Sequence, residues 1–126
     1  RTIAREGVGA LQGGAIGRLM VEALARAGGI MALSDLANAG PKLREPVRGQ
    51  YRGFEVLAPP PPSSSGVHIA QMLNVLEGFD LGALGFGTVE AVHLLAETMK
   101  LAFADRAVGT ADPDFVTAPV AALLSK

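Results

Sequence analysis

The sequence contains no cysteine and no tryptophan, and its aromatic residues are one tyrosine and five phenylalanines. The absence of cysteine excludes disulfides and thiolate chemistry, but it leaves the compartment open because many secreted proteins also lack disulfides. An excess of basic charge is missing too, since 11 basic and 12 acidic side chains give a net charge of −1 without a Lys/Arg-rich block. The chain therefore lacks the electrostatic footprint of a nucleic-acid-binding protein.

Long apolar runs are also missing. No stretch approaches the roughly 18 uninterrupted apolar residues of a membrane-spanning helix. No basic segment followed by an apolar one opens the chain, as it would in a signal peptide. We therefore expect no membrane span in this sequence.

Apolar residues are nevertheless abundant in short segments. Hydrophobic residues make up 49% of the chain, charged residues 18%, and the mean hydropathy is +0.34. This is more apolar surface than the core of one 126-residue domain normally absorbs. The chain also opens at Arg1 inside a helical pattern and closes after Pro119 without a glycine stop. We expect a fragment of a longer polypeptide, whose remainder buries the surplus.

Helical periodicity dominates the first part of the chain. Apolar residues at three- and four-residue spacing predict a helix near residues 14–27. Gly28 and Gly29 follow as a left-handed stop. Ser34 is a suitable N-cap for a short helical turn. Residues 1–40 are therefore expected to be helical.

The pattern changes to a β-hairpin over residues 45–58. Val47 and Tyr51 flank Gly49-Gln50, which predicts a turn between two antiparallel strands. Two strands alone are marginally stable in water, so we expect them to extend a sheet supplied by the rest of the protein. Residues 59–66 form a Pro/Ser linker, and residues 67–126 are again expected to be helical. The fold class is thus mainly α (α+β), a single helical fragment with one hairpin over residues 1–126.

Two helices are predicted after the linker. The first begins with Ser64 or Ser65 as its cap and runs to about Gly78. The second is the longest element, has Thr88 as its N-cap and ends before Gly109. One face of this long helix carries its apolar side chains: Val89, Val92, Leu95, Ala96, Met99 and Phe103.

Two groups of residues have spacings that occur in metal sites. Glu90, His93 and Glu97 share one helical face, and Glu-x-x-His is used by di-iron carboxylate bundles. The second such motif is missing, so a solvated polar stripe is the better interpretation. Asp112 and Asp114 flank a proline and could bind a hard cation, but this arrangement is more typical of a turn with an Asx cap. We predict no metal and no cofactor.

The linker and its surroundings allow further interpretations. Pro59–Pro62 could bind an SH3-like groove, but their position between a strand and a helix favours a rigid connector. Ser63–Gly66 precede a helix, so their backbone N–H groups could bind an anion, although simple capping explains the same residues. Asp105-Arg106 is expected to form a local or tertiary ion pair.

Several stretches resemble, in the same order, the large subunit of the gamma-glutamyltransferase (gamma-glutamyltranspeptidase) family. The most specific is a Tyr-Arg-Gly-aromatic strand that leads into a Pro-Pro-Pro-Ser-Ser-Gly-Gly element and a helix. The stretches that carry the resemblance are Tyr51–Phe54, Pro59–Gly66, Gly28–Ile30, Leu33–Ala37, Ala102–Arg106 and Asp112–Val116. They cover nearly the whole chain.

This resemblance implies a portion of an αββα N-terminal-nucleophile hydrolase. Such an enzyme cleaves its own precursor to expose a threonine nucleophile, and it transfers or hydrolyses gamma-glutamyl groups of glutathione-type substrates through an acyl-enzyme. The implied partners are the remainder of the polypeptide, including the catalytic small subunit, and gamma-glutamyl small molecules. The family suggests a periplasmic or extracellular location.

The catalytic residues are expected outside this chain, which alone should be inactive. None of the threonines stands in the family's Thr-Thr-His-like setting: Thr2, Thr88, Thr98, Thr110 and Thr117. The loop of Ser63, Ser64, Ser65 and Gly66 is the one candidate for lining the substrate cleft.

The sequence departs from the family pattern at two places. Ser65 replaces the first glycine of the usual pair, and Gly109-Thr110-Ala111 stands where an aromatic residue, leucine and glycine are common. These changes leave the acyl donor open. A related acylase, such as a cephalosporin acylase or a poly-gamma-glutamate-processing enzyme, is the alternative. A non-catalytic helical interaction module is a further one.

Overall fold

The computed structural model describes all residues from Arg1 to Lys126 and divides into two compact units. The first unit comprises Arg1–Leu43 and the second Arg44–Lys126. The fold is mainly helical with one two-stranded antiparallel sheet, which confirms the predicted fold class. None of its helices combines the length and the apolarity that crossing a bilayer requires.

The first unit is built from four short helices. They are α1 (Thr2–Glu6), α2 (Gly9–Gln12), α3 (Ala15–Arg26) and α4 (Leu33–Asn38), and α2 contacts the other three. Gly17 allows this packing, because a Cβ atom there would lie 2.0 Å from the carbonyl oxygen of Leu11. The side chain of Gln12 donates to the carbonyl of Ala39 at 2.6 Å and ties the end of the unit back to α2.

The ends of these helices test the predicted caps. Gly28 has a φ of 82°, and the N–H of Gly29 donates to the carbonyl of Leu24, so the left-handed stop after α3 is confirmed. Ser34 as the N-cap of α4 is wrong. The helix begins two residues earlier, after Ala32, and the carboxylate of Asp35 accepts the N–H of Ala32 at 2.8 Å. The acidic side chain in the first turn therefore takes the capping role expected of the serine.

The hairpin consists of β1 (Val47–Tyr51) and β2 (Phe54–Ala58), with Val47 opposite Ala58 and Tyr51 opposite Phe54. Its turn is Arg52-Gly53, so the turn predicted at Gly49-Gln50 is wrong. Both turn residues have positive φ angles, 49° and 84°, as a two-residue hairpin loop of type I′ requires.

Gly49 has another role within β1. A Cβ atom at Gly49 would lie 3.1 Å from the Cβ of Ala70, which belongs to the helix packed on the strand. Such a contact is tighter than most real Cβ contacts. The glycine therefore permits close approach of a helix to the sheet, and does not mark the turn.

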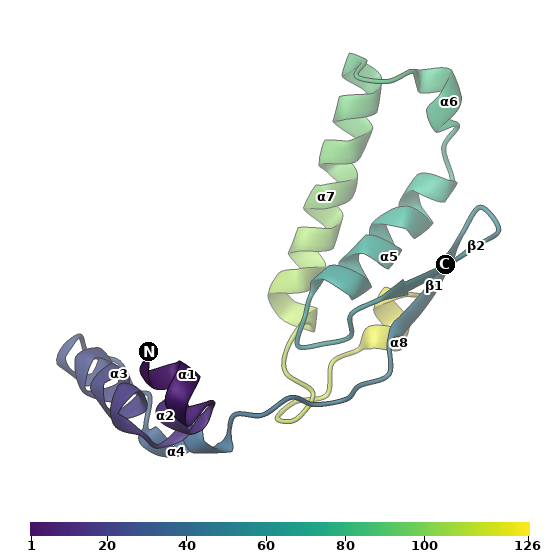
Figure 1. Ribbon diagram of the computed structural model, residues 1–126. Helices are drawn as coiled ribbons and strands as arrows, with labels where there is room; N and C mark the ends of the chain where they lie inside the picture. Colours follow the sequence, from purple (N-terminus) through teal and green to yellow (C-terminus); the bar gives the residue numbers. More distant parts are fainter. The chain divides into compact units, whose positions relative to one another are not determined.

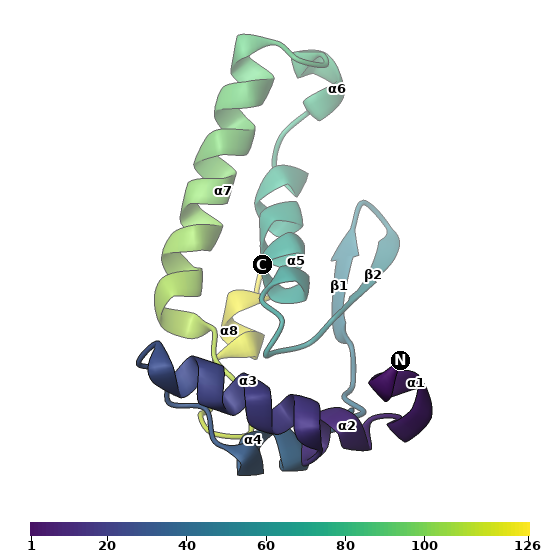
Figure 2. The ribbon, with the colours of Figure 1, turned by 60° about the vertical axis from the view of Figure 1, so that its left-hand side comes forward.

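The remaining helices of the second unit are α5 (Ser65–Glu77), α6 (Leu81–Leu84), α7 (Val89–Gly109) and α8 (Val120–Leu123). Helix α5 lies between the hairpin and α7, and α8 packs near the start of α5 (Figures 1 and 2). The core is small and is centred on α5. It consists of Val47, Val67 and Ala70, with Val120, Leu123 and Leu124 packed against them.

Helix α7 confirms its predicted start, because the hydroxyl of Thr88 accepts the N–H of Ala91 at 3.2 Å. It ends at Gly109, one residue later than predicted. The residues that it buries are Thr98, Ala102 and Gly109. We call the apolar side chains on its other surface the outer face of α7; they are Val89, Val92, Leu95, Met99 and Phe103, and all are exposed.

Candidate binding loop and its surroundings

The Pro/Ser linker connects β2 to α5 by a close crossing of the chain. Gly66 is buried, and a Cβ atom there would lie 2.1 Å from the carbonyl oxygen of Pro59. Pro61 is buried as well, and the N–H of Ser63 donates to the carbonyl of Pro60 at 3.2 Å. Pro61 therefore belongs to the packed structure, which agrees with the interpretation of the run as a connector.

The serines of the linker contact one another and α7. The hydroxyls of Ser63 and Ser65 lie 2.9 Å apart. Ser64 is the N-cap residue of α5, but its side chain makes no capping hydrogen bond and accepts instead from Nε of Arg106 at 3.0 Å. The predicted position of Ser64 at the N-cap is therefore confirmed, but its expected capping hydrogen bond is absent and the hydroxyl bonds to Arg106 instead.

A small hollow of about 330 Å³ adjoins this contact. Its polar lining residues are Ser64, Arg106, Thr110 and Asp112, and the others are Pro62, Ala107 and Ala111. The structure thus brings Ser64 to a hollow, whereas Gly66 is buried beneath it in the chain crossing. The role of Ser63, Ser64, Ser65 and Gly66 in lining a substrate cleft stays a prediction.

A chain of polar side chains links α5, α7 and the residue that follows α7. His68 is 6% exposed. Its Nδ1 lies 3.0 Å from Oε1 of Gln71, and its Nε2 lies 2.8 Å from the hydroxyl of Thr110. The side-chain amide of Gln71 donates to the carboxylate of Asp105. The predicted local or tertiary ion pair of Asp105 and Arg106 is wrong, since Asp105 accepts from Gln71 and Arg106 donates to Ser64.

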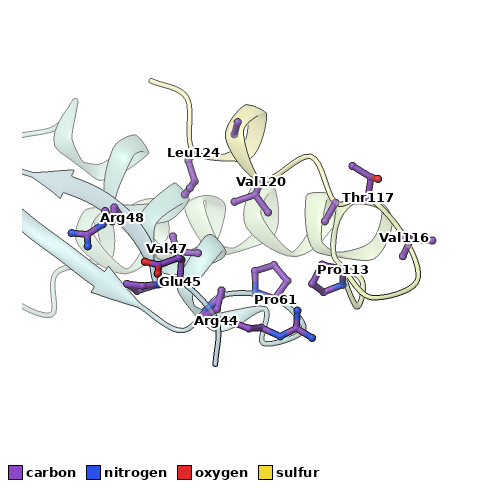
Figure 3. Close-up of a pocket in the computed structure, with 14 residues that line it drawn as sticks. Arg44, Glu45, Val47, Arg48, Pro61, Pro113, Val116, Thr117, Val120 and Leu124 are labelled. Atoms are coloured by element: carbon purple, nitrogen blue, oxygen red, sulfur yellow. The ribbon is translucent and has the colours of Figure 1, made fainter. Parts of the chain in front are cut away.

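A larger hollow of about 800 Å³ lies beside the hairpin (Figure 3). Its walls come from the approach to β1, the proline run, the segment after α7, and α8. Figure 3 shows Val47, Pro61, Pro113, Val120 and Leu124 along an apolar wall, with charged side chains near them. The hollow is thus an apolar surface with a charged edge.

Arg44 dominates the charged edge of this hollow. Its guanidinium is 3.4 Å from Asp112 and 2.8 Å from Asp114, and its side chain is 24% exposed. The carboxylate of Asp112 also accepts the N–H of Asp114 at 3.0 Å, which confirms the predicted Asx turn. The planar guanidinium of Arg44 carries several N–H donors that suit carboxylates. It therefore pairs with the two aspartates that could have bound a cation.

The second candidate metal group is solvated. Glu90 and His93 are exposed, and Glu97 pairs with Lys100 at 2.8 Å. The hydrogen bond from Lys100 lowers the pKa of Glu97, as does its positive charge. No three histidine or acidic side chains gather in this structure as ligands of one ion would.

Sequence reasoning missed the partners that organise these surfaces. The ion pairs of Arg44 could not be predicted from local sequence, because its partners lie 68 and 70 residues away. The i, i+3 spacing of His68 and Gln71 could have indicated a polar pair on one face of α5. Nothing in the sequence could have pointed from that pair to Thr110, which is 42 residues from His68.

The curated proteins that this chain resembles include proenzymes of two kinds. It is 62% identical to an acylase ACY 1 proenzyme of Pseudomonas sp. (strain V22), over 100% of the chain and 23% of that protein. It is 42% identical to a glutathione hydrolase proenzyme of Escherichia coli (strain K12), over 98% of the chain and 21% of that protein. The chain thus spans less than a quarter of the length of these curated relatives.

A solved structure and a family model agree with the sequence relatives. The crystal structure of Helicobacter pylori gamma-glutamyltranspeptidase matches with a TM-score of 0.81 and 41% identity, over 98% of this chain and 35% of that one. The gamma-glutamyltranspeptidase family model matches residues 1–126. These matches cover the strand–proline–helix crossing and the Asx turn after α7, and this chain belongs to the gamma-glutamyltranspeptidase family.

Proposed function

We propose that this chain is a portion of the large subunit of an enzyme that transfers or hydrolyses gamma-glutamyl groups through an acyl-enzyme. The observation that carries the proposal is the family match over residues 1–126 together with the TM-score of 0.81 to a gamma-glutamyltranspeptidase. In this proposal residues 1–126 act as one segment of an αββα hydrolase. The remaining polypeptide, including the catalytic small subunit, is its partner, and the enzyme works in the periplasm or outside the cell.

The segment serves the reaction by supporting the catalytic half. A threonine nucleophile needs a base at hand, such as its own free amine. The nucleophile that the family resemblance implies is a threonine at the head of the small subunit, whose own amine is that base. None of the threonines here stands in that setting: Thr88 caps α7, Thr98 is buried within the helix packing, and Thr110 joins α7 to His68 of α5. We therefore place the nucleophile outside this chain and propose that the Ser63–Gly66 loop lines the cleft.

An acylase with a different donor is the second candidate. The identity of 62% to an acylase ACY 1 proenzyme, against 42% to a glutathione hydrolase proenzyme, favours it. Both candidates predict a proenzyme that cleaves itself. They differ in the acyl group that the mature enzyme accepts.

The test compares the full-length protein with the 126-residue chain. Both are assayed for release from a gamma-glutamyl chromogenic amide and for hydrolysis of a cephalosporin amide, and the full-length protein is checked for self-cleavage by gel electrophoresis. The first candidate predicts a cleaved protein that prefers the gamma-glutamyl amide, and the second one that prefers the cephalosporin amide. A full-length protein that stays uncleaved and hydrolyses neither, or a 126-residue chain active alone, would refute the proposal.

A further inference from the structure

The carboxylate of Asp105 fixes which groups donate and which accept in the hydrogen bonds around His68. A carboxylate only accepts, so the group of Gln71 that meets Asp105 is its NH₂. The carbonyl oxygen of Gln71 therefore faces His68 and accepts from Nδ1. In the neutral ring Nε2 then carries no proton, and it accepts from the hydroxyl of Thr110 at 2.8 Å.

Thr110 stands at the start of an irregular segment, residues 110–118, between α7 and α8. Within the segment, the N–H groups of Phe115 and Val116 both donate to the carbonyl of Asp112. These bonds fold a local turn but do not connect it to a helix or strand. The hydroxyl of Thr110 makes a connection to α5, and Arg44 makes another at the acidic turn.

The same segment walls the two hollows described above. Thr110, Ala111 and Asp112 line the small one, and residues 113 and 116–118 line the large one. A displacement of the segment would therefore open both hollows together. Whatever fixes Thr110 fixes one wall of each.

We propose that the chain Thr110–His68–Gln71–Asp105 is a latch that holds segment 110–118 against α5. In the latch, Nδ1 of His68 donates to Gln71 and Nε2 accepts from Thr110. The carboxylate of Asp105 anchors the far end of the chain on α7. The latch positions the walls of the hollows and takes no part in chemistry. It is independent of the acyl donor that the enzyme uses.

The test removes one hydroxyl and measures the freedom of the segment. In the full-length protein, Thr110→Val deletes the donor at nearly constant volume, and Thr110→Ser keeps it. Thr117→Val is the matched control, because Thr117 is an exposed residue of the same segment. Amide hydrogen exchange of peptides that cover residues 110–118 is followed by mass spectrometry, with peptides of α3 as an internal reference.

Loss of one hydrogen bond to a buried partner should speed exchange of this segment by about three- to tenfold in Thr110→Val. Thr110→Ser and Thr117→Val should stay near the wild-type rate. Equal rates in Thr110→Val and Thr117→Val would overturn the latch, as would failure of the serine variant to retain protection while the reference peptides are unchanged.

A double-mutant cycle tests whether His68 is the partner. His68→Asn keeps a side-chain N–H for Gln71 but has no group in the place of Nε2. In that background Thr110→Val should add little further exchange, because the bond is already absent. An undiminished effect of Thr110→Val in the His68→Asn protein would show that the hydroxyl acts through another group, and the proposal would be wrong.

Discussion

Substitution of Gly66 by alanine tests the close crossing between the end of β2 and the start of α5. The added Cβ would lie 2.1 Å from the carbonyl oxygen of Pro59 and 3.0 Å from the Cβ of Ala58. Real Cβ atoms essentially never approach other atoms within 3.0 Å, so the backbone of the linker has to move by about 1 Å. Because the obstacle is backbone, a side-chain rotation cannot relieve it.

The magnitude follows from two opposed effects. Alanine is favoured over glycine within a helix by up to about 1 kcal/mol. Overpacking of a buried site costs typically about 1 to 3 kcal/mol and more where backbone is displaced. We expect Gly66→Ala to lower the free energy of unfolding by about 2 kcal/mol and to loosen the first turn of α5.

Gly78 at the other end of α5 provides the matched control. Its backbone angles, φ of −73° and ψ of −3°, can be adopted by any residue, and an added Cβ would meet the carbonyl oxygen of Val75 at 3.5 Å, an ordinary contact. Gly78→Ala should be neutral or stabilise by up to about 1 kcal/mol, because it restricts the unfolded chain.

The assay compares both variants in the full-length protein by thermal unfolding and by amide exchange of α5 peptides. We expect a lower midpoint and faster exchange for Gly66→Ala only. If Gly66→Ala is as stable as Gly78→Ala, the carbonyl of Pro59 does not approach Gly66 in solution. The argument that this position requires glycine would then fail.

Three further predictions concern single contacts. The hydrogen bond from Lys126 is the largest cause that lowers the pKa of Glu77, so this pair stabilises the fold fully above the ordinary glutamate pKa of about 4.3. That stability is lost as pH falls through the lowered pKa, and acid titration of unfolding should show a smaller loss in Glu77→Gln than in the wild type. Replacement of Arg44 by methionine should lower the local stability around Asp114 by about 1 kcal/mol and so speed amide exchange there. Replacement by lysine should retain part of the protection. Equal exchange in the wild type and both variants would refute this role of Arg44. The buried hydroxyl of Thr98 has no hydrogen-bond partner, so Thr98→Val should raise the free energy of unfolding by about 1 kcal/mol and with it the thermal midpoint. A lower midpoint would show that the hydroxyl does have a partner in solution.

Local signals predicted two helix ends correctly, because these ends depend on neighbouring residues alone. The hydroxyl of Thr88 caps α7 through the N–H of Ala91, and Gly28 has the positive φ of a left-handed stop after α3. The turn of the hairpin was mispredicted for a tertiary reason. Gly49 is needed where Ala70 packs against the strand, so the glycine that seemed to mark the turn marks a helix contact.

The surroundings of the candidate loop could not be predicted from the sequence for the same reason. Serines before a helix are expected to cap it, and Ser64 does occupy the N-cap position. Its hydroxyl nevertheless meets Arg106, which lies 42 residues away on α7. The spatial arrangement of α5 and α7 decides this contact, and periodicity contains no information on it.

The apolar stripe along α7 was predicted correctly from its spacing, but it does not face the core of this chain. The apolar stripe predicted along α7 is present, but its members are exposed; Val89, for example, is 81% exposed. The side of α7 that contacts α5 is made of small and polar residues such as Ala102 and Thr98, which allow close approach. Exposed apolar faces of this kind are rare on free-standing domains. The outer face of α7 therefore agrees with the excess of apolar residues in the composition, and both support the proposal that this chain works as a segment of a longer protein.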